Sequence, residues 1–320
     1  MAFDHILTRS SAMPPVLQAA SHIAATDVSV LITGESGTGK EIMARAIHDA
    51  SPRNKAAFVT INCAALPDNL AESLLFGHRK GSFTGADQQH VGLIAAADQG
   101  TLFLDEIGEL SPALQAKLLR FLESGEILPL GEVRTRRVNV RVLAATHCDL
   151  YRMTCHGSFR TDLYYRLNVV PLQLPTLRER PEDIALLTEH FLGYFASHHR
   201  LAEARPDPET LRRMAAHPWP GNIRELRNTC ERLSILMAGC IVKPQHLDQY
   251  LPDTRQQDAA TRPATDAFQL PSQGVNLEAL EKDLLTQALQ LAARNKTQAA
   301  GLLGISRDAL NYRLKKHALA

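Results

Sequence analysis

Short apolar runs rich in β-branched residues alternate with helix-like stretches through the first half of the chain. The runs occupy residues 28–33, 58–61, 101–104 and 138–145. A helical pattern follows the first run over residues 40–50. Strands separated by helices are typical of a largely parallel sheet that is covered on both faces and carries ligand chemistry at the carboxyl ends of its strands. We therefore predict an α/β subdomain over residues 1–175.

The β-like runs disappear after about residue 175, and helical spacing replaces them. Ile184, Leu187 and Phe191 recur at intervals of three and four residues, which is typical of one face of a helix. We predict a helical subdomain over residues 176–252. Residues 253–274, rich in Gln, Thr, Asp and Ala, indicate a flexible linker, and a small all-α unit is predicted over residues 275–320.

Composition bears on the number of domains, the state of the cysteines and the cellular location. The chain has 320 residues, enough for two or three domains, and its 35 Lys and Arg nearly balance its 34 Asp and Glu. Five cysteines form no C-x-x-C pair, which favours reduced thiols rather than a disulfide framework or a zinc site. We recognise no apolar run of membrane-spanning length and no signal peptide, so a cytoplasmic protein is expected.

A phosphate-binding loop of the pattern G-x-x-x-x-G-K follows the first apolar run and precedes the first helix. It comprises Gly34, Glu35, Ser36, Gly37, Thr38, Gly39 and Lys40. Its glycines let backbone N–H groups turn toward phosphates, and Lys40 would reach the β- and γ-phosphates of a nucleotide. Glu41 stands where a Ser or Thr ligand of Mg²⁺ is usual.

An acidic pair, Asp105-Glu106, ends the third apolar run. Asp105 fits a Mg²⁺ ligand, and Glu106 is suited to orient an attacking water, which hydrolysis needs and nucleotide binding alone does not. The sequence therefore predicts an ATPase that uses ATP and Mg²⁺. Between these motifs lies a glycine-bounded hexapeptide, which suggests what the hydrolysis is for: Gly81, Ser82, Phe83, Thr84, Gly85 and Ala86.

The last segment has the pattern of a helix-turn-helix. From residue 294 onward six Lys or Arg face one acid, Asp308. Residues 297–307 read as a helix, a glycine-containing turn and the start of a second helix, with Ser306 as its N-cap. Candidate DNA contacts are Thr297, Ser306, Arg307, Asn311, Arg313 and Lys315.

In five ordered segments the chain resembles the sigma-54-dependent transcriptional activators, or bacterial enhancer-binding proteins. The segments are GESGTGKE (34–41), GSFTGA (81–86), GTLFLDE (100–106), FRTDLYYRL (159–167) and WPGNIREL (219–226). The resemblance implies an AAA+ P-loop domain over 1–175, a helical AAA+ lid over 176–252 and a Fis-type helix-turn-helix over 275–320. Only about two dozen residues precede the first strand, so we expect no N-terminal regulatory domain and consider a regulator acting in trans.

The resemblance also implies roles for single residues. Asn62 matches the asparagine that restrains the catalytic glutamate, and Glu41 is a familiar residue after the loop lysine. Thr146 matches sensor I, with His147 following where the family often has Asn, and Arg224 matches sensor II. Arg160 and Arg166 match arginine fingers, donated to a neighbouring subunit in a ring that is usually a hexamer. Phe83 and Thr84 match residues that contact sigma-54.

We therefore predict an activator that binds enhancer DNA as a dimer contacting a two-fold site, and that remodels closed complexes of sigma-54 RNA polymerase into open complexes. One alternative is a DNA-binding regulator of other promoters that uses its AAA+ domain as a ligand-gated switch. Another is a remodeller of a different DNA-bound complex, such as a replication initiator. Relatives of the first kind typically lack the intact hexapeptide, and the second alternative leaves the hexapeptide without a role.

Overall fold

The computed structural model describes residues 3–82, 88–248, 251, 276–292 and 295–317. By its internal contacts the chain divides into two compact units, residues 1–254 and 255–320. The finer domain boundaries given above stay predictions. Phe83, Thr84, Gly85 and Ala86 of the hexapeptide and the predicted linker lie outside the described residues.

A five-stranded parallel sheet forms the centre of the first unit, which confirms the predicted α/β class. Its order is β2-β5-β8-β1-β9, with strands β1 (Val30–Thr33), β2 (Phe58–Asn62), β5 (Thr101–Asp105), β8 (Arg141–Thr146) and β9 (Val170–Gln173). The apolar pattern does not predict β9, which lies at the edge of the sheet and contains Pro171. An edge strand tolerates proline because its outer side makes no ladder hydrogen bonds.

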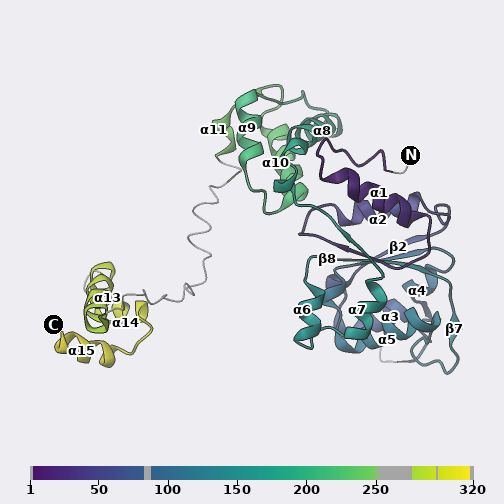
Figure 1. Cartoon of the computed structure of the whole chain (residues 1–320), viewed down its shortest axis with the longest axis horizontal. Coiled ribbons are helices and arrows are strands. Elements are labelled where there is room, and N and C mark those ends of the chain that lie inside the picture. Colours follow the sequence, from purple (N-terminus) through teal and green to yellow (C-terminus); the bar gives the residue numbers. More distant parts are fainter. Residues whose placement is uncertain (1–2, 83–87, 249–250, 252–275, 293–294, 318–320) are drawn as a thin grey trace. The chain divides into compact units, whose positions relative to one another are not determined.

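Alternate residues of each strand face two different cores. Leu102 and Leu104 of β5 pack in one apolar cluster, whereas Phe103 packs in the other. Helices α1 (Met13–Ala24) and α2 (Lys40–Asp49) cover the face of Phe103. On the opposite face lie α3 (Asp68–Phe76), α4 (Leu93–Ala96), α5 (Pro112–Ser124), α6 (Leu150–Cys155) and α7 (Thr161–Leu167) (Figure 1).

The helical part of this unit has its own core. It is built from α8 (Pro181–His199), α9 (Pro208–Ala216), α10 (Asn222–Leu236) and α11 (Pro244–Leu247), with a two-residue strand pair β10 (Arg205–Pro206) and β11 (Ile241–Val242). Trp219 is fully buried at its centre and donates its indole N–H to the carbonyl of Met214 at 2.8 Å. This anchors the turn that leads into α10.

Two short hairpins carry the hexapeptide and the loop of residues 128–135. The hexapeptide lies between β3 (Gly77–His78) and β4 (His90–Val91), and residues 128–135 join β6 (Glu126–Ile127) to β7 (Arg136–Arg137). The N–H of Arg79 donates to the carbonyl of Leu130 at 3.0 Å, and the N–H of Leu130 donates to Gly77 at 2.9 Å. The base of the hexapeptide loop is therefore fixed against the second loop.

The second unit is a small all-α fold with its own core. It consists of α13 (Leu277–Leu291), α14 (Lys296–Leu302) and α15 (Arg307–Lys316), which pack around Leu285, Leu310 and Leu314. Ser306 caps α15, accepting from the N–H of Ala309 at 3.2 Å, which confirms the predicted cap. In the described part of the chain we find no helix long and apolar enough to cross a membrane.

Candidate active site

The phosphate-binding loop joins β1 to the N-terminus of α2. Gly39, the N-cap of α2, adopts a left-handed backbone with φ 100°, and Gly37 has φ 79°. A Cβ on Gly37 would lie 2.3 Å from the carbonyl oxygen of Gly221, so only glycine fits there. The loop can therefore aim its N–H groups and the positive end of the α2 dipole at an anion.

Lys40 lies inside this loop with 6% of its surface exposed. Its ammonium donates to the carbonyls of Gly34 at 2.9 Å and Glu35 at 3.3 Å, and lies 3.8 Å from Oε1 of Glu106. Burial lowers the pKa of Lys40, and the charges of Glu106 and Asp105 oppose that effect. A buried cation held mainly by neutral carbonyls suits the binding of phosphate oxygens.

The acidic pair lies at the carboxyl end of β5, beside the loop. Asp105 pairs in register with Asn62 of β2. Burial, followed by the charge of Glu106, raises the pKa of Asp105 above its ordinary value. A bound cation would relieve both effects, and carboxylate oxygens are the ligands that Mg²⁺ prefers, so this residue fits a magnesium ligand.

Glu106 adopts a left-handed backbone with φ 50° and ψ 50°, a conformation that costs free energy for a non-glycine residue. Its carboxylate is held by a residue for which the sequence suggested no such role. Oε2 lies 2.6 Å from Nδ1 of His147 and accepts from the backbone N–H of His147 at 3.3 Å. Such strain is common where a side chain must be aimed at a reacting group.

The other residues around Glu106 are engaged differently from what the resemblance implies. The amide oxygen of Asn62 accepts from the N–H of Ala64 at 3.0 Å and caps the 3₁₀ turn η1 (Cys63–Ala65). The hydroxyl of Thr146, which is fully buried at the end of β8, accepts from the N–H of Cys148 at 3.0 Å. The roles of Asn62 and Thr146 therefore stay predictions.

The helical subdomain contacts the loop directly. Arg224 donates to the hydroxyl of Ser36 at 2.8 Å, and the N–H of Ile223 donates to the carbonyl of Gly37 at 3.0 Å. Asn222, whose backbone is left-handed with φ 51°, donates to the carbonyl of Ser36 at 3.0 Å. Sequence reasoning found Arg224 but not Asn222, although the preceding Trp-Pro-Gly suggests an unusual turn.

A mostly apolar cavity of about 150 Å³ opens beside α2. Its lining includes residues from the N-terminal segment, α2 and the helical subdomain: Ile6, Leu7, Met43, Leu174, Phe191 and Ile223. A second cavity of about 310 Å³ contains Lys40, Asp105, Glu106 and Arg224, and both cavities share Gly39, Ile42 and Ile223. Together they suit a flat apolar ring joined to a chain of phosphates.

The sequence motifs do not reveal the apolar cavity, because its residues come from segments far apart in the chain. The candidate arginine fingers lie outside both cavities, at the two ends of α7. Arg160 forms a bidentate pair with Asp162 at 3.0 and 2.7 Å, and Arg166 donates to the carbonyl of Leu122 at 3.0 and 2.8 Å. Both guanidinium groups are exposed, as a donation to another subunit requires.

The candidate DNA contacts lie on α14, at the N-cap of α15 and along α15 of the second unit. Thr297, Ser306, Arg307, Arg313 and Lys315 are exposed, whereas Asn311 is partly buried. Arg313 is also held within the unit, because it donates to Glu281 of α13 at 2.8 Å. Arg307 is therefore the clearer candidate for a phosphate or base contact.

Three family descriptions match consecutive parts of the chain. "Sigma-54 interaction domain" matches residues 6–173, "AAA+ ATPase lid domain" residues 178–264 and "Bacterial regulatory protein, Fis family" residues 276–317. The regulatory protein AtoC of Escherichia coli is 45% identical, covering 99% of this chain and 68% of AtoC. FlbD of Caulobacter vibrioides is 42% identical, covering 98% and 70% of the two chains.

A solved structure gives the same result. The structure of NtrX from Brucella abortus in complex with ATP is similar with a TM-score of 0.72 and 32% identity, covering 98% of this chain and 69% of NtrX. The site geometry, the matched domains and the relatives agree. The chain belongs to the family of sigma-54-dependent transcriptional activators, with a sigma-54 interaction domain, an AAA+ lid and a Fis-type helix-turn-helix.

Proposed function

We propose that this chain activates transcription by binding enhancer DNA and using ATP hydrolysis to convert closed complexes of sigma-54 RNA polymerase into open complexes. One observation carries the proposal. A phosphate-binding loop, an acidic pair and an apolar cavity form one nucleotide site in a chain that also contains the sigma-54 interaction and Fis-type domains. AtoC is described as a regulatory protein and FlbD as a transcriptional regulatory protein, which supports a cytoplasmic location.

The residues of the site have different roles in ATP hydrolysis. Lys40 and the N–H groups of its loop bind the phosphates, and Glu106 accepts a proton from the attacking water. Asp105 would hold Mg²⁺, which supplies charge neutralisation on the phosphate oxygens when bound. Arg224 and Asn222 connect the loop to the helical subdomain, so occupancy of the site can change how the two subdomains meet.

Assembly completes the site in this proposal. The exposed Arg160 and Arg166 reach the nucleotide of a neighbouring subunit, where a guanidinium stabilises charge in the transition state. A head-to-tail contact of this kind closes into a ring, which is a hexamer in the family. A regulator acting in trans could control when the ring forms.

The second unit supports dimeric binding to a two-fold DNA site. Leu277, Leu284 and Leu291 of α13 are 75%, 44% and 79% exposed. They recur every seven residues, so they lie along one side of the helix. Burial of these leucines against a second copy would remove apolar surface from water, while α15 presents its basic side chains to DNA.

Phe83 and Thr84 are proposed to contact sigma-54. Their loop starts from a base that is fixed to the segment at Leu130, so a movement of one loop would be transmitted to the other. We expect Thr84→Ala to keep substantial ATPase activity and to lose open-complex formation, measured with purified sigma-54 holoenzyme on an enhancer-bearing template.

Two comparisons complete the test. Lys40→Ala should lose both activities, and holoenzyme carrying the housekeeping sigma factor should not respond to the wild-type chain. Normal activation by Thr84→Ala would contradict the role of the loop. Activation of the housekeeping holoenzyme alone would instead favour a regulator of other promoters.

A further inference from the structure

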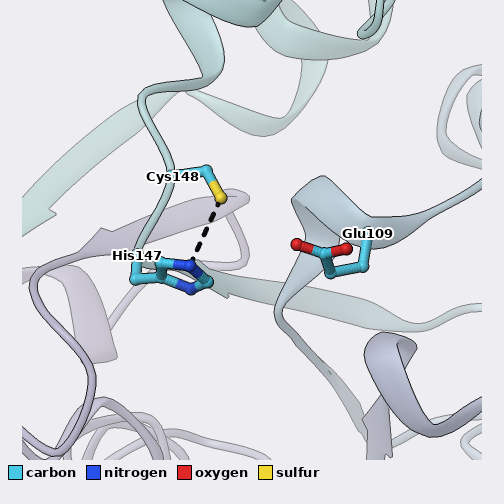
Figure 2. Close-up of side chains that lie close together, drawn as sticks. All are labelled: Glu109, His147 and Cys148. Atoms are coloured by element: carbon cyan, nitrogen blue, oxygen red, sulfur yellow. Dashed lines mark hydrogen bonds between the residues drawn. The ribbon is translucent and has the colours of Figure 1, made fainter. Parts of the chain in front are cut away.

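Three side chains with different donor atoms lie close together, and one of them contacts Glu106. They are Glu109, which ends the 3₁₀ turn η2 (Ile107–Glu109), and His147 and Cys148, which follow β8. One ligand atom from each lies within 4.8 Å of the other two, and Sγ of Cys148 is 3.6 Å from Nε2 of His147. Figure 2 shows the carboxylate of Glu109 directed toward the His147–Cys148 pair.

The donor set selects a class of ion. A thiolate sulfur, an imidazole nitrogen and a carboxylate oxygen together suit Zn²⁺ and similar transition ions, whereas Mg²⁺ and Ca²⁺ prefer oxygen alone. Ligands of a tetrahedral zinc ion, at about 2.0–2.3 Å from the metal, lie roughly 3.5 Å apart. Small side-chain movements would bring the three atoms to that spacing and leave the fourth position to water.

His147 is already oriented as metal-binding histidines are. Its Nδ1 lies 2.6 Å from Oε2 of Glu106, so the tautomer with the proton on Nδ1 makes this hydrogen bond and leaves the Nε2 lone pair facing Cys148. A histidine that ligates a metal commonly donates its other N–H to a carboxylate. Here the carboxylate that completes this arrangement is the candidate catalytic base.

The three groups are accessible to an ion from solvent. Glu109 and His147 are exposed and Cys148 is partly buried. Burial, with the negative charges of Glu109 and Glu106, raises the pKa of the Cys148 thiol, so metal binding would release a proton.

We propose that Glu109, His147 and Cys148 bind a thiophilic divalent ion of the Zn²⁺ class, and that its binding restrains Glu106 and slows hydrolysis. A metal on Nε2 makes the Nδ1 proton a stronger donor, which holds the Glu106 carboxylate more tightly against His147 and leaves it less free to orient an attacking water. The inhibitory part rests on the proposed role of Glu106 in hydrolysis, whereas the binding part does not.

Binding is tested on the full chain with Zn²⁺ in a chelator competition and with Co²⁺, whose absorption spectrum reports thiolate ligation. We expect one site per wild-type chain, and at least tenfold weaker binding with loss of the thiolate signal in Cys148→Ser. Glu109→Gln should also weaken binding. Cys155→Ser, which removes an exposed cysteine outside the cluster, is the matched control and should bind as the wild type does.

Inhibition is tested as the ratio of ATPase rates with and without Zn²⁺ in excess Mg²⁺. The rate with Zn²⁺ should be at most about one fifth of the rate without it in the wild type and in Cys155→Ser. The two rates should be nearly equal in Cys148→Ser. Equal zinc binding or equal inhibition in Cys148→Ser would overturn the proposal. A wild-type chain that binds zinc through Cys148 but shows no ATPase activity in any condition would refute the proposed function and leave the metal site standing.

Discussion

Nδ1 of His147 lies 2.6 Å from Oε2 of Glu106. Glu106 follows β5 and His147 follows β8, and these two strands are neighbours in the sheet. Hydrogen bonds to charged groups contribute about 1.5–3 kcal/mol, which corresponds to roughly a ten- to hundredfold change in rate if the bond positions the base. With Mg²⁺ as the only divalent ion, we expect His147→Ala to lower kcat about tenfold or more and to leave KM nearly unchanged.

His147→Asn should recover much of this loss, because its amide can donate to the same carboxylate. His156→Ala removes an exposed histidine that contacts the carbonyl of Arg152 and serves as the control. Steady-state ATPase kinetics measure all three variants. A wild-type kcat in His147→Ala would rule out a positioning role.

Lys40 and Glu106 should separate nucleotide binding from hydrolysis. Lys40→Ala removes the buried ammonium of the loop and should abolish binding of a fluorescent ATP analogue. Glu106→Gln keeps the shape of the side chain but cannot accept a proton, so binding should persist while kcat falls at least about a hundredfold. Retention of more than a tenth of the activity in Glu106→Gln would show that another group acts as base.

Arg160 and Arg166 should act at the nucleotide site of a neighbouring subunit. Each change to Ala should preserve nucleotide binding and reduce kcat by about a thousandfold, the lower range for an arginine finger. Mixing Arg160→Ala with Lys40→Ala should restore part of the activity, because the second chain supplies the finger and the first supplies an intact loop. Arg152→Ala, at an exposed arginine on α6, is the control. Mixtures that stay inactive would argue against donation between subunits.

Arg307 should contribute to DNA binding without contributing to the fold of its unit. We expect Arg307→Ala to weaken binding of an enhancer fragment and to reduce the slope of log affinity against log salt by about one, as the loss of one phosphate contact predicts. Lys282→Ala, which changes an exposed lysine on α13, should leave the slope unchanged. Fluorescence anisotropy across a salt series measures the affinity and the slope for both variants. Equal slopes for Arg307→Ala and the wild type would show that Arg307 makes no phosphate contact.

The buried and exposed cysteines should differ strongly in their rates of alkylation. Burial raises the pKa values of the Cys63 and Cys230 thiols to about 12, because a thiolate is disfavoured away from water. At pH 8 only about one in ten thousand of these groups is ionised, so they should resist alkylation until the chain unfolds. Cys155 and Cys240 are exposed and should react first, as mass spectrometry of the labelled peptides would show. Rapid labelling of Cys63 in the folded chain would contradict this burial.

Much of the site follows from local sequence. The glycine pattern before Lys40 and the carboxylates after an apolar run each describe a turn whose geometry depends on a few adjacent residues. The helix-turn-helix is equally local, since Ser306 and the glycine-containing turn set its helix boundaries. Such features are predictable because the backbone preferences of neighbouring residues determine them.

The sequence by itself determined the class of fold, the phosphate-binding loop, the acidic pair and the basic helix, because each depends on short-range periodicity or turn chemistry. Only the tertiary structure decided that His147 meets Glu106, that Asn222 meets the phosphate loop and that an apolar cavity adjoins Lys40. Those contacts depend on β8 lying beside β5 and on the packing of the helical subdomain against α2. The free energy of burying apolar surface between distant segments sets that arrangement, and no single stretch of sequence encodes it.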